Sequence, residues 1–83
     1  GKVKITSELR MKGIPSSLIQ EALAAIDEDD YIAYLKEILQ KKLRQLGSLS
    51  PANRQKAMFF AASRGFEPAL VSSLLKNNDL LDL

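Results

Sequence analysis

The stretch KGIPSSLI at residues 12–19 returns as RGFEPALV at residues 64–71. Both copies carry, in order, a basic residue, a glycine, a large apolar residue, a proline-bearing turn and a pair of apolar residues. The likeness continues beyond them, because Ala22-Leu23 matches Leu74-Leu75 at the same spacing of 52 residues. A period near 50 residues in a helical sequence indicates a repeated supersecondary unit.

Each copy predicts a tight corner between two helices. Gly13 and Gly65 would each end a helix in the left-handed conformation, which glycine adopts without steric cost. Lys12 and Arg64 precede them in the last turn, where positive charge meets the negative end of the helix dipole. A proline follows each glycine and suits the first turn of the next helix. We therefore expect an all-α fold with right-angled helix corners at Gly13 and Gly65.

The apolar spacing and the capping residues predict five helices and no sheet. Gly47 is expected to end the longest helix, and Ser50 with Pro51 to begin the next one. Residues 79–83 read as an acidic and apolar tail. The expected helices span residues 3–12, 15–26, 28–46, 51–64 and 68–77.

Composition excludes several classes of function. The chain has 83 residues and a net charge of +2, which permits an acidic partner or nucleic acid without requiring either. It contains no cysteine and no histidine, so it lacks disulfides, thiol nucleophiles, the commonest general base and most zinc ligands. We expect no catalytic residue, no cofactor and no metal. No apolar run reaches the length of a membrane span and no secretory signal is visible, so a cytoplasmic location is expected.

The charges of the longest helix follow its dipole. Its acids, residues 27–30, lie at the N-terminus, while Lys41, Lys42 and Arg44 lie near the C-terminus. Solvated charge matched to the dipole explains most of this pattern. Lys42 is different, because it falls within the apolar arc of the helix and must extend past its edge or meet a polar partner.

The next helix carries a run of six apolar residues, 57–62, which cannot all face one core. We expect Phe60 to point inward. Phe59 is expected at a second contact or partly exposed, where it covers a neighbouring helix or marks a partner surface.

Three segments together resemble a known family, the RecX regulatory proteins. They are ELRMKGIPSSLIQEALAAIDEDD at residues 8–30, LQKKLRQL at residues 39–46 and NRQKAMFFAASRGFEPALVSSLL at residues 53–75. RecX proteins are built from tandem three-helix repeats, and the resemblance implies about one and a half to two of them here. Residues 1–27 would form the last two helices of a middle repeat, and residues 28–83 a complete C-terminal repeat.

The resemblance also implies a function. RecX proteins bind the RecA recombinase and its filament on single-stranded DNA, and restrain strand exchange and ATPase activity. Basic residues of the family match Lys12, Lys41, Lys42, Lys56 and Arg64. Because Lys12 and Arg64 already have a structural role at helix ends, Lys41, Arg44 and Lys56 are the better candidates for a partner surface. The chain departs from the pattern at Phe59, where family members often carry a basic residue.

Three other readings stay open. The corner at Gly13 followed by an Ala-Leu helix resembles a ubiquitin-associated peptide-binding module, but such a module ends in a short third helix. A nucleic-acid module needs several cations on one face, whereas residues 15–26 contain no lysine or arginine and residues 68–77 contain only Lys76. Weak contact with a DNA backbone through residues 36–56 remains an alternative, as does self-association of the end that a missing helix would leave exposed.

Overall fold

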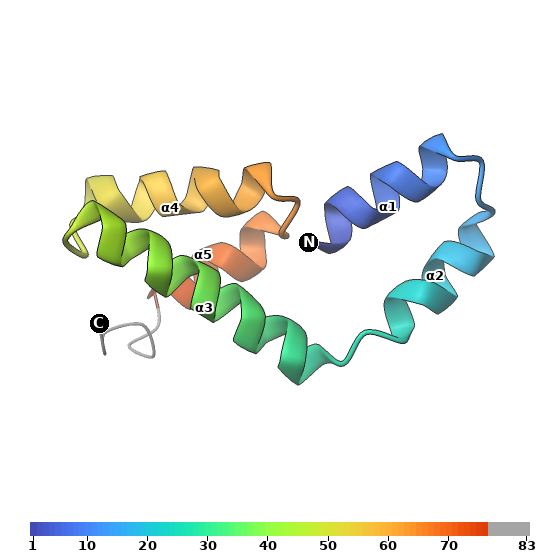
Figure 1. Ribbon diagram of the computed structural model, residues 1–83, viewed down its shortest axis with the longest axis horizontal. Coiled ribbons are helices and arrows are strands. Elements are labelled where there is room, and N and C mark those ends of the chain that lie inside the picture. Colours follow the sequence, from blue (N-terminus) through green and yellow to red (C-terminus); the bar gives the residue numbers. More distant parts are fainter. Residues whose placement is uncertain (77–83) are drawn as a thin grey trace.

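The computed structural model describes residues 1–76, and all of its regular structure is helical (Figure 1). The predicted all-α fold is confirmed, with helix ends within two residues of the expected ones. Two expectations, the end of the last helix at residue 77 and the tail at 79–83, lie outside the described residues. The helices are α1 (Lys2–Met11), α2 (Ser16–Ala24), α3 (Glu28–Leu46), α4 (Pro51–Ser63) and α5 (Pro68–Lys76).

Both corners end in the same backbone motif. The amide of Gly13 donates to Arg10 O at 3.0 Å and that of Ile14 to Leu9 O at 3.1 Å. After α4, the amides of Gly65 and Phe66 donate in the same pattern to Ala62 O and Ala61 O. Such paired bonds satisfy the last helical carbonyls and need a left-handed residue, and both glycines have a φ near +80° (78° and 83°). The predicted repeat of the corner is therefore confirmed.

Side chains set the starts of α3 and α4. Asp27 Oδ1 accepts a hydrogen bond from the amide of Asp30 at 2.9 Å. Ser50 Oγ accepts one from the amide of Asn53 at 3.2 Å, with Pro51 at the first helical position. Both contacts satisfy amides that the helix itself leaves free. Pro15 differs from its expected place, because it is the cap before α2 rather than the first residue within it.

The core lies where α3, α4 and α5 pack together. The long helix buries Tyr31, Leu35, Leu39 and Leu43, at intervals of four residues, so that one stripe faces its neighbours. From α4 the buried residues are Ala57 and Ala61, whose small side chains allow close packing. Phe66, Val71, Leu74 and Leu75 complete the cluster.

The prediction that Phe60 belongs to this core is wrong. Phe60 is half-buried and lies outside the core cluster, since the two alanines take the inward positions of α4. Phe59 is 66% exposed, in line with the expectation that it is partly exposed.

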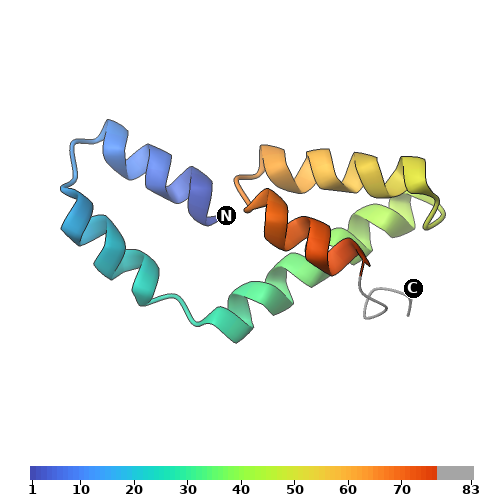
Figure 2. The same ribbon diagram turned by 180° about the vertical axis from the view of Figure 1, so that it is seen from behind.

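Helices α1 and α2 pack against each other and stand apart from the core (Figures 1 and 2). Within α2 only Ile19 is buried. Large apolar side chains remain open on this pair, among them Met11 at 86% and Leu18 at 51% exposure. The start of α1, marked N in both views, reaches the corner between α4 and α5.

This junction is built around Gly65 and Tyr31. The carbonyl of Gly65 accepts from the amide of Val3 at 2.9 Å, and the Tyr31 hydroxyl accepts from the amide of Lys2 at 3.0 Å. These partners satisfy two free amides of the first turn of α1. The Tyr31 hydroxyl in turn donates to Glu67 Oε1 at 2.5 Å. The Lys2 ammonium lies 4.5 Å from the centre of the Tyr31 ring and forms an ion pair with Glu28 Oε2 at 2.7 Å.

Candidate functional site

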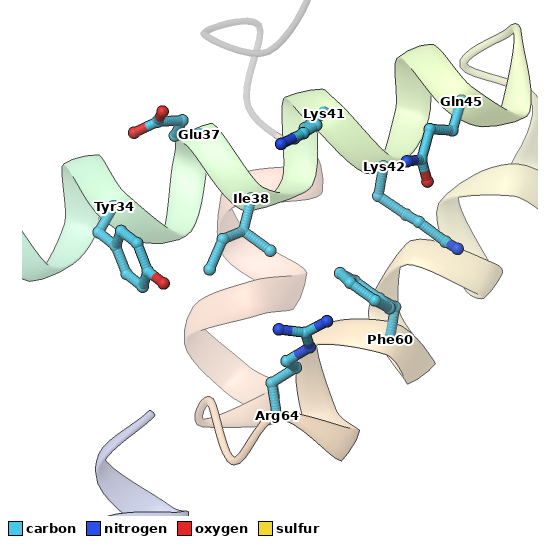
Figure 3. Close-up of a pocket in the computed structure, with 8 residues that line it drawn as sticks. All are labelled: Tyr34, Glu37, Ile38, Lys41, Lys42, Gln45, Phe60 and Arg64. Carbon is cyan, nitrogen blue, oxygen red and sulfur yellow. The ribbon is translucent and has the colours of Figure 1, made fainter.

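A groove runs along one side of α3, where α4 approaches it, and encloses a cavity of about 360 Å³ (Figure 3). It lies beside the stripe that α3 buries, so its lining is open to solvent on one side. The long helix contributes Tyr34, Glu37, Ile38, Lys41, Lys42 and Gln45, and α4 with its cap contributes Phe60 and Arg64.

Helical spacing explains why these side chains meet. Positions 34, 38, 41 and 45 follow one another by three or four residues, which places them on one face of α3. On α4, Phe60 precedes Arg64 by four residues, so both point toward the same side. The groove is thus formed by matching faces of two packed helices.

Phe60 is the centre of the groove. The Lys42 ammonium and the Arg64 guanidinium each lie 4.7 Å from the centre of its ring. Figure 3 shows them on opposite sides of the ring. A cation over an aromatic face is attracted by the ring quadrupole, by about 0.5–1 kcal/mol at exposed sites. The ring therefore holds two flexible cationic side chains in defined places.

This contact also accounts for Lys42. The sequence predicts that Lys42 either extends past the apolar edge of the helix or meets a polar partner. In the structure its ammonium lies over the face of Phe60 instead. The lysine is half-buried, and its charge lies at the edge of the groove.

The groove carries more positive than negative charge. Lys41, Lys42 and Arg64 line it together with one acid, Glu37. Among residues 1–76, no carboxylate lies within ion-pair distance of these three cations. Their charges are consequently available to an anionic ligand.

The other predicted partner-binding residues are not in the groove. Arg44 lines a separate pocket of about 260 Å³ at the end of α3. Lys56 is exposed one helical turn before Phe60 on α4. Lys12 is the cap of α1, at the corner with α2 and far from the groove along the molecule (Figure 1). The structure therefore groups Lys41, Lys42 and Arg64 and separates Lys12 and Arg44 from them.

Sequence reasoning missed the aromatic and acidic members of this site, Tyr34, Glu37 and Phe60. The available signal was the pair Lys42 and Phe60, since the first is a cation within an apolar arc and the second an aromatic residue one turn before Arg64. Only the packing of α3 against α4 brings the two signals together.

The described part of the chain offers neither a metal-binding cluster nor a membrane-spanning helix. No cluster of three or more histidine, cysteine, aspartate or glutamate side chains is arranged there to hold a metal ion. None of the helices within residues 1–76 has both the length and the hydropathy that crossing a membrane requires.

Comparison with known proteins places residues 28–75 in the family described as RecX, third three-helix domain. Regulatory protein RecX of Pelodictyon phaeoclathratiforme is 36% identical over 77 residues, covering 92% of this chain and 46% of that protein. The protein of the same name from Legionella pneumophila (strain Corby) is 33% identical over 76 residues, covering 92% and 50%. That from Pseudomonas entomophila is 32% identical over 82 residues, covering 99% and 52%. The chain thus spans about half the length of these relatives. No solved structure matches it.

Proposed function

Because this chain belongs to the RecX family, we propose that it is a non-enzymatic regulatory module that binds the RecA recombinase and its filament on single-stranded DNA. In this role it restrains recombination and the ATPase activity of the filament by occupying its surface. The proposed site of action is the cytoplasm. The proposal rests on the family name, Regulatory protein RecX, which the relatives share.

One observation supports the groove as the surface through which we propose that the module docks. Within the described residues, Lys41, Lys42 and Arg64 form a cluster without counter-ions around a half-buried aromatic ring. Aromatic and arginine side chains are enriched where protein partners bind. The groove lies on α3, on α4 and on the cap residue of α4, within the segment that matches the third three-helix domain.

We further propose that residues 28–83 form the final repeat and residues 1–27 the last two helices of the repeat before it. Two observations support this division. The match to the third domain begins at residue 28, and α3, α4 and α5 bury a common core, whereas α1 and α2 leave apolar side chains exposed. A preceding helix in a longer protein would cover that face.

The ubiquitin-associated alternative has less support. Helix α3, which follows the α1–α2 pair, has 19 residues and is about 28 Å long at 1.5 Å per residue. This is long for the closing helix of such a module. A module that reads DNA through its corners is also poorly supported, since α2 carries no cation and α5 only Lys76.

Selective retention on the filament tests the proposal. Immobilised protein is mixed with RecA assembled on single-stranded DNA, with free RecA and with bare single-stranded DNA, at two salt concentrations. We expect the filament to be retained more strongly than either component. Retention of bare DNA alone, with a steep loss in salt, would instead identify a nucleic-acid module.

A further inference from the structure

We infer that the groove between α3 and α4 binds an acidic peptide segment of a protein partner, with carboxylates meeting Lys42 and Arg64 on either side of Phe60. The inference deepens the proposed function and rests on it only in taking that segment to belong to the RecA filament. Its physical basis is a pair of cations that lie over one ring, neither of which forms an ion pair with a described residue.

The geometry of Arg64 suits a carboxylate. Its guanidinium lies 4.7 Å from the centre of the Phe60 ring, and none of its N–H groups is hydrogen-bonded to a described residue. Those N–H groups form a fork that matches the two oxygens of a carboxylate. Because Phe60 already orders both cations, binding loses less side-chain entropy than it would with two unrestrained side chains.

Apolar side chains beside the cations favour a peptide over a small anion. Ile38 lines the groove, and Tyr34 is 59% exposed with its ring 6.3 Å from that of Phe66. The cavity of about 360 Å³ has room for one or two side chains. A segment that alternates acidic and apolar residues would fill both parts of the groove.

Nucleic acid fits the same groove less well. Proteins that bind single strands stack the bases on free aromatic faces. The Phe60 ring offers no such face because cations lie on both of its sides, so only the exposed Tyr34 ring is left for stacking. The Glu37 carboxylate lies among the lining residues and would repel a backbone that carries a charge at every nucleotide. A peptide can instead present an apolar or basic residue to Glu37.

Peptide binding measured by fluorescence anisotropy provides the test. The probes are a fluorescein-labelled dodecapeptide of alternating glutamate and phenylalanine, its twin with glutamine in place of glutamate, and a labelled oligo(dT) of equal charge. The variants are Lys42→Met and Arg64→Gln, which keep most of each side chain's bulk. Matched controls are Arg44→Gln and Lys56→Gln, which remove cations outside the groove.

The glutamate peptide should bind the wild-type protein, and each groove variant should weaken binding about ten-fold or more, as loss of a charge-assisted hydrogen bond does. The control variants should bind the glutamate peptide as the wild type does, which assigns the effect to the groove. The glutamine peptide should bind the wild type more weakly than the glutamate peptide, which assigns the effect to the carboxylates. Equal binding of the glutamine peptide, equal loss in the controls, or tighter groove-dependent binding of oligo(dT) would overturn the inference.

Retention of the RecA filament distinguishes a failure of this inference from a failure of the proposed function. If the wild-type protein retains the filament and both groove variants retain it equally, the inference fails and the proposed function stands. If the acidic peptide binds the groove but the filament is not retained, the proposed function fails and the chemistry of the groove stands.

Discussion

The Tyr31 hydroxyl donates a hydrogen bond to Glu67 Oε1 across 36 positions of sequence, at 2.5 Å. The hydroxyl oxygen of Tyr31 also accepts a hydrogen bond from the amide of Lys2, so one phenol joins α1, α3 and the corner before α5. Its ring lies 5.5 Å from that of Phe66. Tyr31 is thus both a core residue and the polar link through which the α1–α2 pair is held.

Replacing Tyr31 with phenylalanine should destabilise the protein by about 1–3 kcal/mol, because Glu67 and the Lys2 amide lose a partner at a partly buried place. The free energy of unfolding in urea measures this loss. Tyr34→Phe is the matched control, since Tyr34 is 59% exposed and should cost less than about 0.5 kcal/mol. Equal effects of the two variants would contradict the role of Tyr31.

Stability should also fall at alkaline pH. Burial, together with the hydrogen bond to Glu67, raises the pKa of Tyr31 from 10.0 to about 12. The folded state therefore favours the neutral phenol; its contribution is complete below pH 10 and is lost as the pH rises from 10 to 12. At about 1.4 kcal/mol per pH unit, the loss is at most about 2.7 kcal/mol.

Tyrosinate absorbance measures this titration directly. The Tyr34→Phe variant leaves Tyr31 as the only tyrosine of the chain. Its absorbance should change near pH 12 when the protein is folded and near the ordinary value of 10 when urea unfolds it. The same midpoint in both states would show that the environment of Tyr31 is not the one described.

Alanine should be tolerated less well at Gly65 than at Gly13, although both glycines are left-handed. A Cβ on Gly65 would overlap the backbone nitrogen of Lys4, at 2.6 Å, whereas a Cβ on Gly13 has no neighbour within 4 Å. Gly13→Ala should cost about 1 kcal/mol for the backbone conformation alone. Gly65→Ala should cost more and should also release α1, seen as faster hydrogen exchange of its amides. Equal costs and unchanged exchange would contradict this junction.

Phe60→Ala should destabilise by only about 1–2 kcal/mol, because Phe60 is half-buried outside the core. Leu39→Ala is the comparison, since Leu39 is 0% exposed and should cost about 2–5 kcal/mol. The free energies of unfolding in urea show which of the two variants is destabilised more. A larger loss for Phe60 would return it to the core, where the sequence pattern had placed it.

Local signals made most of the fold predictable. Capping residues such as Asp27 and Ser50 accept hydrogen bonds from amides within four residues of the chain. The corner glycines are recognisable because the sequence around them is repeated. The role of Tyr31 was not predictable in this way, because its two hydrogen bonds join residues 29 and 36 positions apart. A pattern of apolar residues reports that such a ring is buried and gives no information about the hydroxyl.

The candidate site was predictable only in part. Lys41, Lys42 and Arg64 were named from the sequence, and the structure brings them into one groove. Phe60 was assigned to the core because its helix carries too many apolar residues for periodicity to separate. The buried alanines at 57 and 61 resolve that ambiguity, since close packing with α3 leaves the phenylalanine at the edge.

The most direct measurement is the affinity of the protein for RecA assembled on single-stranded DNA, compared with that of Lys42→Glu/Arg64→Glu. The matched control is Arg44→Glu/Lys56→Glu, which changes the net charge equally but outside the groove. We predict that the groove variant binds at least about ten-fold more weakly while the control stays within a few-fold of the wild type. Equal weakening in both variants would attribute binding to overall charge, and wild-type affinity in the groove variant would contradict the assignment of the groove as the docking surface.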